Sequence, residues 1–260
     1  MTPTASTDAD RAVSRRARHR EQTTGEIVDA ARALLAEDVE LSLRAIAGRI
    51  GMTAPALYRY VGSHQELVEL VAFEIDRAAT VELAAAADSH PADDHAARLC
   101  ASAAAFRTWG LREPREFALA FANPIAESSC ARRDLVTVAH SAMHFTDQLR
   151  AIWEQRRFPL PRVEDLPPAV QEAVRDPLIP AKTAGLDDAD RGLLWVYIQG
   201  WVRLYGIVTL EVMGHLDPRI IDSGDMFLQA MLGFLPTIGL ADERERLEGV
   251  LRAHLVPVTG

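Results

Sequence analysis

Residues 42–67, SLRAIAGRIGMTAPALYRYVGSHQEL, contain the pattern that decides the fold of this 260-residue chain. Ser42 is a favoured helix N-cap residue, and the apolar residues that follow it have the three- and four-residue spacing of a short helix. Gly51 suits the positive φ of a tight turn, and Thr53 opens a second short helix over 54–60. The stretch therefore predicts two short helices joined by a glycine turn.

The segments on both sides of this stretch are also expected to be helical. A preceding helix is predicted to begin at Thr23, whose spacing to Glu26 is that of a capping box. A following helix is predicted from Ser63, which has the same spacing to Glu66. Apolar residues recur with helical periodicity along the chain, and no run alternates with the two-residue period of a strand. We expect an all-α protein.

Helices of the remaining chain are expected near 95–112, 114–122, 128–156, 168–175, 188–213, 223–236 and 242–254. Apolar residues make up 48% of the chain, which is enough for a globular core. The two cysteines, Cys100 and Cys130, exclude a disulfide scaffold and a cysteine zinc finger. The polar first residues predict no secretory leader, and charged residues interrupt the longest apolar stretch, 193–212. We therefore expect a cytoplasmic protein that does not span a membrane.

Charge is distributed unevenly along the chain. The net charge is −9, yet residues 1–66 hold nine arginines and nine acidic residues, whereas residues 67–260 hold 19 basic and 28 acidic residues. Residues 11–20, RAVSRRARHR, contain five arginines and no acidic residue. A basic arm on an acidic body suits contact with a polyanion, for example along the minor groove of DNA, and a solvated tail explains the composition equally well.

Two short helices joined by a glycine turn, with a supporting helix on each side, form a helix-turn-helix. In this motif the second helix lies in the major groove, with its first residues facing the base edges. Leu57 is expected in the core, which leaves Tyr58, Arg59 and Tyr60 on the outside. Hydroxyl and guanidinium groups on one exposed short helix suit contacts with phosphates and bases.

Residues 27–67, IVDAARALLAEDVELSLRAIAGRIGMTAPALYRYVGSHQEL, resemble the DNA-binding domain of the TetR family of transcriptional regulators. The matching pieces are the I-x-x-A-A start, R-x-I-A-x-x-I-G, L-Y-R-Y and S-x-x-E-L. His64 stands where the family usually has a lysine, and Val61 where it has a phenylalanine. The resemblance implies a double-stranded DNA operator as partner and the following contact residues: Arg44, Thr53, Ala54, Pro55, Tyr58, Arg59, Tyr60 and His64.

Residues 197–216, YIQGWVRLYGIVTLEVMGHL, resemble the W-x-x-x-H-G helix of one class of TetR C-terminal domains, with Tyr205 in place of the histidine. Residues 106–121 resemble the paired helices of the same class. The resemblance implies a pocket for a small, mostly apolar molecule. The pocket candidates are aromatic, soft or polar residues on the enclosing helices: Phe106, Trp109, Phe121, Asn123, His140, Met143, His144, Tyr197, Gln199 and Trp201. Most of the aromatic residues, Phe117 and Phe145 included, are expected to be core.

His140 and His144 are four residues apart and therefore share one helical face. No carboxylate of an H-E-x-x-H motif lies between them, so a polar pair in the pocket or core is favoured over a metal site. We expect no metal and no other cofactor.

The helices near 188–213 and 223–236 are apolar on more than one face, so each must be covered on several sides. The resemblance implies that these helices pair in a homodimer, and burial inside one large monomeric core is the alternative.

No dinucleotide-binding glycine motif, phosphate-binding loop, nucleophile elbow or metal-ligand cluster occurs in the sequence, so we expect no enzyme. The alternative is an all-helical ligand-binding or enzyme domain, which would not bind DNA at low salt.

The expected organisation has three parts: a basic disordered arm over 1–20, a three-helix DNA-binding domain over 21–66 whose linker helix continues to about residue 86, and a larger helical ligand-binding and dimerisation domain over 87–260. The expected function is that of a one-component repressor. As a dimer it binds a palindromic operator, and a small, mostly apolar molecule releases it.

Overall fold

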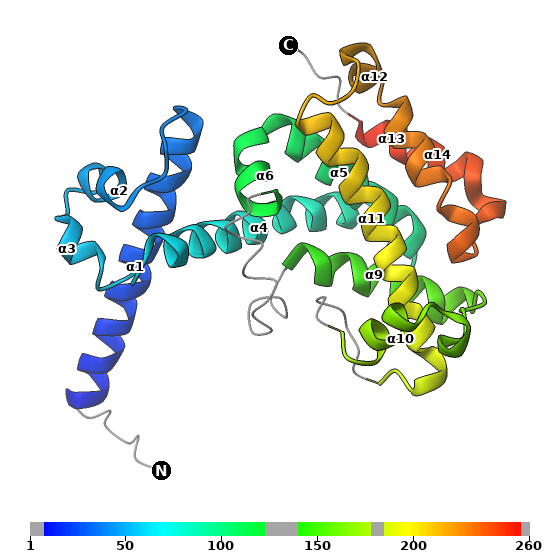
Figure 1. Ribbon diagram of the computed structural model, residues 1–260, viewed down its shortest axis with the longest axis horizontal. Helices are drawn as coiled ribbons and strands as arrows, with labels where there is room; N and C mark the ends of the chain where they lie inside the picture. Colours follow the sequence, from blue (N-terminus) through cyan, green and yellow to red (C-terminus); the bar gives the residue numbers. More distant parts are fainter. Residues whose placement is uncertain (1–7, 123–139, 178–184, 256–260) are drawn as a thin grey trace. The chain divides into compact units, whose positions relative to one another are not determined.

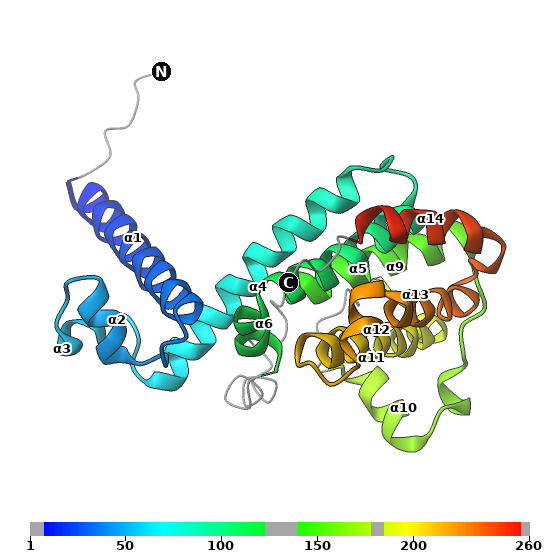
Figure 2. The same cartoon turned by 90° about the horizontal axis from the view of Figure 1, so that it is seen from above.

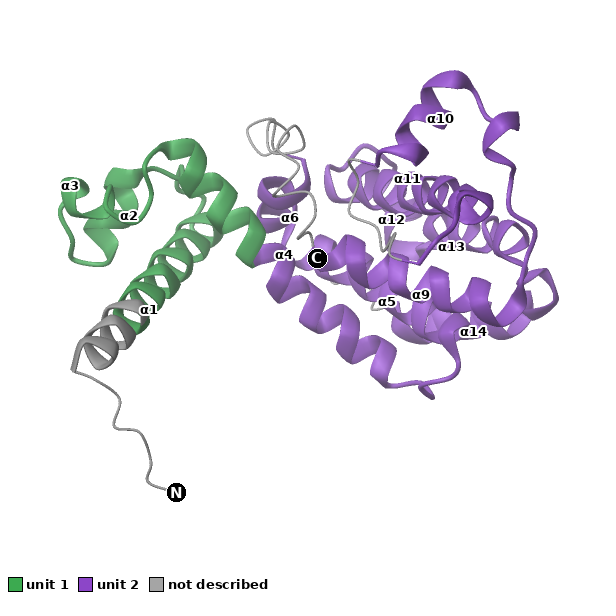
Figure 3. Cartoon of the chain, turned by 90° about the horizontal axis from the view of Figure 1, so that it is seen from below, with its two compact units in different colours: residues 1–74 green, residues 75–260 purple. Residues whose placement is uncertain are grey.

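The computed structural model describes residues 8–122, 140–177 and 185–255, and all regular structure in these ranges is helical (Figure 1). The expectation of an all-α fold is confirmed. The chain divides into two compact units, Met1–Glu74 and Ile75–Gly260 (Figure 3). The division falls inside one continuous helix, α4 (His64–Asp88), which is the linker helix expected from the sequence.

Unit 1 (Met1–Glu74) is built around α1 (Asp8–Ala36), α2 (Leu43–Arg49), α3 (Ala54–Leu57) and the start of α4. Each of these helices contributes one face to the core of the unit. The side chains with exposed fractions between 0% and 5% include Ile27, Ala31, Leu34, Ile46, Leu57 and Leu67. Each such buried aliphatic side chain stabilises the unit by roughly 1.5–3 kcal/mol relative to an exposed one. This small core fixes α2 and α3 against α1.

The start of α1 differs from the prediction of a disordered arm over 1–20 followed by a helix from Thr23. The helix already begins at Asp8, so residues 8–20 are helical, and residues 1–7 lie outside the described part. Arginine and alanine are strong helix formers, which favours this extension. The Thr23 hydroxyl donates to the carbonyl of His19 at 3.0 Å, so it is bonded within the helix and does not cap it.

Unit 2 (Ile75–Gly260) contains the rest of α4 and the following helices: α5 (His95–Arg112), α6 (Pro114–Phe121), α9 (His140–Arg156), α10 (Pro168–Arg175), α11 (Gly192–Val212), α12 (Pro218–Ser223), α13 (Asp225–Leu232) and α14 (Arg244–His254). Within the unit, α5 packs against α9, α11 and α14, and α11 packs against α13 (Figure 2). The core of the unit thus lies around α5 and α11.

Several bounds in unit 2 agree with the sequence pattern, and three differ. The predicted helix 188–213 begins with a 3₁₀ turn, Asp188–Arg191, before α11. The predicted helix 223–236 is divided into α13 and a 3₁₀ turn, Leu235–Ile238, because Gly233 ends α13. The short helix α12 was not predicted. Of the predicted helix 128–156, the part before His140 lies outside the described residues.

One segment of the described ranges, Asp188–Val212, is long and apolar enough to cross a membrane by length and composition alone. It contains Glu211, which is only 2% exposed, and α11 packs against four helices of its own unit, α5, α9, α10 and α13. These are the surroundings of a core helix, and core helices meet the same length and composition criterion.

Candidate DNA-binding interface and ligand cavity

The turn between α2 and α3 has the geometry of a helix-turn-helix. Ser42 caps α2 by accepting the N–H of Ala45 at 3.2 Å. Gly51 has a φ of +69°, and the N–H of Met52 returns to the carbonyl of Ala47 at 2.8 Å, which closes the turn. The chain therefore leaves α2 in a left-handed glycine and enters α3 directly.

The second helix is shorter than predicted. α3 ends at Leu57, and hydrogen-bonded turns continue to Tyr60, whose N–H donates to the carbonyl of Leu57 at 2.9 Å. Thr53 occupies the N-cap position, but its hydroxyl makes no capping hydrogen bond, so it remains available to an external acceptor or donor. Leu57 is fully buried, as the sequence predicts.

A reciprocal cap starts α4 directly after these turns. The N–H of Glu66 donates to the Ser63 hydroxyl at 3.0 Å, and the Glu66 carboxylate accepts the N–H of Gly62 at 2.7 Å. The Ser63–Glu66 spacing was predicted to form a capping box, and the carboxylate reaches one residue further back than in the usual form. This cap fixes the direction in which α4 leaves the helix-turn-helix.

The predicted DNA contacts gather on the outer side of this motif. Tyr58 is 52% exposed, and Thr53, Pro55, Arg59, Arg44 and His64 are also exposed, whereas Ala54 and Tyr60 are half-buried. The guanidinium of Arg20 lies 6.0 Å from the centre of the Tyr60 ring, so α1 borders the same surface. Hydroxyl, guanidinium and methyl groups together suit contacts with phosphates and base edges.

The cations around the motif differ in their availability. Arg49 makes a two-pronged pair with Glu37, with distances of 2.7 and 2.6 Å, and is thereby held within unit 1. This pairing lowers the pKa of the Glu37 carboxyl. Within the described ranges, Arg44 and Arg59 form no ion pair, which leaves both for a polyanion.

His64 is the predicted contact whose geometry is most constrained. Its Nε2 lies 2.8 Å from the carbonyl oxygen of Leu41, which can only accept a hydrogen, so Nε2 carries the hydrogen and donates. Only Nδ1 is left for a phosphate, and Nδ1 can donate only when the ring is doubly protonated. A lysine at this position would need no such change.

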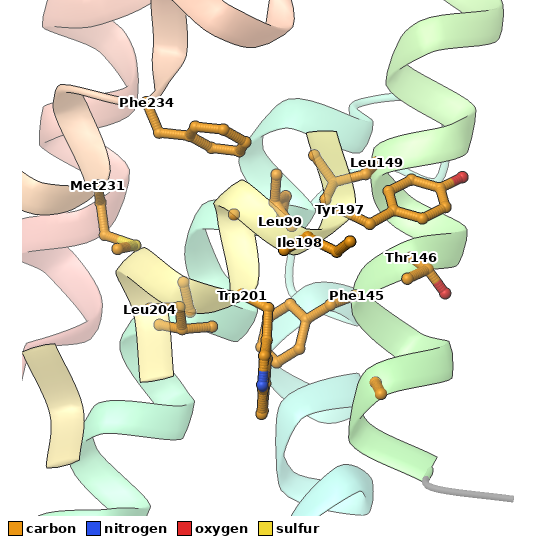
Figure 4. Close-up of a pocket in the computed structure, with 13 residues that line it drawn as sticks. Leu99, Phe145, Thr146, Leu149, Tyr197, Ile198, Trp201, Leu204, Met231 and Phe234 are labelled. Carbon is orange, nitrogen blue, oxygen red and sulfur yellow. The ribbon is translucent and has the colours of Figure 1, made fainter. Parts of the chain in front are cut away.

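Unit 2 contains a cavity of about 160 Å³ between α5, α9, α11 and α13. Figure 4 shows Met231 and Phe234 on one side, Phe145, Thr146 and Leu149 of α9 on the other, and residues of α11 between them. The lining residues are Leu99, Ala103, Ala142, Phe145, Thr146, Leu149, Tyr197, Ile198, Gly200, Trp201, Leu204, Met231 and Phe234. The cavity wall is therefore almost wholly hydrocarbon.

The two oxygens of the lining side chains contribute little polarity. The Thr146 hydroxyl donates to the carbonyl of Met143 at 3.2 Å. The Tyr197 hydroxyl is directed toward α9 and away from Met231 and Phe234 (Figure 4). Burial raises the pKa of Tyr197 above its ordinary value, so this residue stays neutral.

Two of the predicted pocket residues, Tyr197 and Trp201, line this cavity. Phe106, Trp109 and Phe121 instead belong to an adjoining aromatic cluster with Phe117, Phe145, Trp201 and Tyr205, in which ring centres lie 5.3–6.4 Å apart. Met143 and Gln199 are half-buried outside the lining, and Asn123 lies outside the described residues. Tyr205, which replaces the motif's histidine, donates its hydroxyl to the carbonyl of Phe121 at 2.7 Å and so holds the end of α6.

The backbone of His140 contacts α4, and the ring of His144 contacts α5. The N–H of His140 donates to Asp76 of α4 at 2.6 Å, and His144 Nε2 lies 2.8 Å from the Ser102 hydroxyl. Burial lowers the pKa of His144, which favours its neutral form. Within the described ranges, no group of three or more His, Cys, Asp or Glu side chains has the placement of a metal site.

Most of the lining residues that the sequence pattern did not single out are small or aliphatic, and Thr146, Met231 and Phe234 are the others. Ala103, Ala142 and Gly200 make space because they fill little of it, and no motif marks such positions. The helical periodicity places them on buried faces, but it does not indicate which of these faces leave a cavity where they pack together.

The geometry of unit 1 defines a helix-turn-helix DNA-binding protein, and the cavity of unit 2 gives it a separate ligand-sized space. Two family models match the chain. Residues 27–71 match the model of bacterial regulatory proteins of the tetR family, and residues 99–235 match the tetracyclin repressor-like C-terminal domain. Because the second match alone spans more than half of the chain, the chain belongs to the TetR family of transcriptional regulators. The W-x-x-x-H-G class stays a prediction.

Named relatives agree with this assignment. The HTH-type transcriptional regulators Rv1816 of Mycobacterium tuberculosis and Mb1846 of Mycobacterium bovis are each 38% identical over 117 residues, which cover 44% of this chain and 49% of theirs. The chain thus spans about half the length of these curated relatives. The crystal structure of the protein SCO4313 is similar with a TM-score of 0.54 at 25% identity, over 84% of this chain and 98% of that one. The chain therefore belongs to a family of DNA-binding transcriptional regulators.

Proposed function

We propose that this regulator is a cytoplasmic, ligand-responsive repressor that binds a palindromic operator as a homodimer. The observation that carries the proposal is the exposed surface formed by Thr53, Pro55, Tyr58 and Arg59 beside the buried Leu57. Two such surfaces related by a twofold axis would read two half-sites about 34–36 Å apart, or a multiple of this.

The dimer contact is proposed at the exposed apolar residues of α11 and α13. Val202 and Leu210 of α11 are 62% and 42% exposed, and Met226 of α13 is 46% exposed. Large exposed apolar side chains favour a protein partner, and a twofold pairing of identical faces closes the assembly. The alternative of a single monomeric core would leave these side chains in water.

The ligand is proposed to occupy the cavity of unit 2. A cavity of about 160 Å³ with a hydrocarbon wall favours a compact, uncharged molecule that is recognised by shape. Apolar cavities of roughly 150 Å³ stay dry and bind benzene, so toluene is a suitable first probe. Trp201 lines the cavity, so a change in tryptophan fluorescence on addition of toluene is the expected sign of occupancy.

Release would follow from a shift between two populations. A ligand changes operator affinity only if it binds one conformation better than the other. We propose that the liganded form favours a position of α4 in which the two helix-turn-helix motifs of a dimer no longer match successive major grooves.

The experiment is selection of duplexes from a random-sequence pool by the purified protein. We expect enrichment of a palindrome, with binding weakened in Tyr58→Ala and in Arg59→Ala. Arg219→Ala is the matched control, because Arg219 is an exposed arginine of unit 2, paired with Asp217. Selection of no duplex at low salt, or equal loss of binding in the control, would overturn the proposal.

A further inference from the structure

Helix α9 has two different faces in unit 2. One face lines the cavity through Ala142, Phe145 and Leu149. The other is attached to α4 by polar contacts at both ends of its first turn, one of them direct and the other through Ser102 of α5. The first turns of α9 therefore contact both the cavity and the linker helix α4.

The first contact is a buried helix cap. The Asp76 carboxylate of α4 is 7% exposed and accepts the N–H of His140 at 2.6 Å and that of Ser141 at 3.3 Å. The first N–H groups of a helix have no partner within the helix and carry its positive end, so a carboxylate is favoured there. The start of α9 is thus fixed by a side chain of α4.

The second contact lies one turn further along α9. The His144 ring donates through Nε2 to the Ser102 hydroxyl at 2.8 Å, and that hydroxyl donates to the carbonyl of Leu83 at 3.2 Å. Ser102 of α5 is fully buried. Leu83 is two helical turns beyond Asp76, so the two contacts attach the first turn of α9 to one side of α4.

We propose that α9 is the element through which filling of the cavity moves α4, with Asp76 and the His144–Ser102 bridge as its positioning groups. The inference rests on the proposed function, in which the position of α4 sets operator affinity. A molecule in the cavity presses on α9, and a buried hydrogen bond that is stretched leaves unpaired groups at a cost, so α4 follows.

One other attachment of α4 is less suited to this role. Glu82 of α4 pairs with Arg112 of α5 at 2.8 Å, and both side chains are about half exposed. Water replaces such a contact at little cost. Glu82 therefore offers a matched control on the same helix.

The test is a double-mutant cycle in which a side chain stands in for the ligand. Ala103→Leu from α5 and Ile198→Phe from α11 each fill the cavity from a different wall. We expect each to weaken binding of the selected duplex by about tenfold in the wild-type background and in Glu82→Gln. In Asp76→Asn or Ser102→Ala, the same filling should change affinity by less than about threefold, because α4 no longer follows α9.

Several results would overturn the inference. If the cavity-filling substitutions leave duplex affinity unchanged in the otherwise wild-type protein, the position of α4 does not depend on the cavity. Duplex binding itself still supports the proposed function. If the cavity-filling substitutions weaken duplex binding by about tenfold in both the Asp76→Asn and the Ser102→Ala backgrounds, α9 does not connect the cavity to α4. Thermal unfolding identifies a variant that does not fold, and the other variant then decides. If the wild type selects no duplex, the proposed function fails, and the inference is then tested without DNA. The cavity-filling substitutions should change the rate of amide hydrogen exchange of residues 76–88 in the otherwise wild-type protein and should not change it in the Ser102→Ala background.

Discussion

The buried ion pair between Arg107 of α5 and Glu211 of α11 offers a sharp test of how unit 2 is held together. Arg107 Nε lies 2.5 Å from Glu211 Oε2, and the two side chains are 2% and 0% exposed. The Arg107 guanidinium also donates to the carbonyl of Ile221 and lies 5.7 Å from the centre of the Phe227 ring. One charged group thus joins α5 and α11 to the end of α12 and to α13.

We expect Arg107→Met to lower the free energy of unfolding by about 3–5 kcal/mol, because it leaves the Glu211 carboxylate buried without its partner. Replacing both residues, with Arg107→Met and Glu211→Leu, removes both charges and should restore stability to within about 1–2 kcal/mol of the wild type. Urea unfolding followed by circular dichroism, at one protein concentration, measures both effects. A single substitution that costs less than about 1 kcal/mol, or a double variant less stable than either single variant, would refute this reasoning.

The pH dependence of these variants gives an independent check. Burial raises the pKa of the Glu211 carboxyl, and Arg107 opposes that rise. A carboxyl with a raised pKa in the folded state binds its proton more tightly there than in the unfolded state, so its contribution to stability falls as pH rises through the folded pKa. Without Arg107 the pKa rises further. The deficit of Arg107→Met relative to the wild type should therefore be larger at about pH 8 than at about pH 5. The deficit of the double variant, which lacks the Glu211 carboxyl, should not grow over this range.

Three further outcomes are expected. Burial raises the pKa of the Cys100 thiol to about 12, so in a Cys130→Ser background a thiol reagent at about pH 8 should react only as fast as the protein unfolds, and immediate labelling of the folded protein would contradict this burial. Gly51→Ala should cost about 1–2 kcal/mol because φ is +69°, whereas Gly48→Ala, in open space on α2, should stabilise by about 0.5–1 kcal/mol; thermal unfolding compares them, and shifts of the same sign would contradict the turn geometry. Arg59→Ala should lower the slope of log affinity against log salt by about 1 for each bound subunit, and an unchanged slope in duplex titrations would remove Arg59 from the phosphate contacts.

The helix-turn-helix could be predicted because its determinants are local. Ser42, Gly51 and the Ser63–Glu66 spacing each act within four residues, and the structure shows each in the expected role. The start of α1 could not be predicted by the same rule. Thr23 has the spacing of a cap, yet helix-forming residues precede it, and a cap forms only where the preceding chain leaves the helix.

The cavity could be predicted only in kind. Residue type pointed to aromatic side chains, and most of these pack against one another beside the cavity because large rings fill space well. The cavity itself depends on the small side chains of Ala103, Ala142 and Gly200 on three different helices. Which buried faces meet is a tertiary property, so no spacing along the chain reveals it.

The same limit applies to His140 and His144, whose four-residue spacing suggested a pocket or core pair. The structure gives the backbone N–H of His140 a partner on α4 and the ring of His144 a partner on α5, and these contacts limit the effect that the cavity can have on α4 through α9. A buried hydrogen bond contributes about 0.5–1.5 kcal/mol net, and one to a charged group about 1.5–3 kcal/mol. The Asp76 cap and the Ser102 bridge together therefore limit the transmitted free energy to a few kcal/mol, which is the range of measured allosteric couplings, about 5- to 150-fold in affinity. A ligand response much larger than this would require α4 to be moved by contacts other than those of α9.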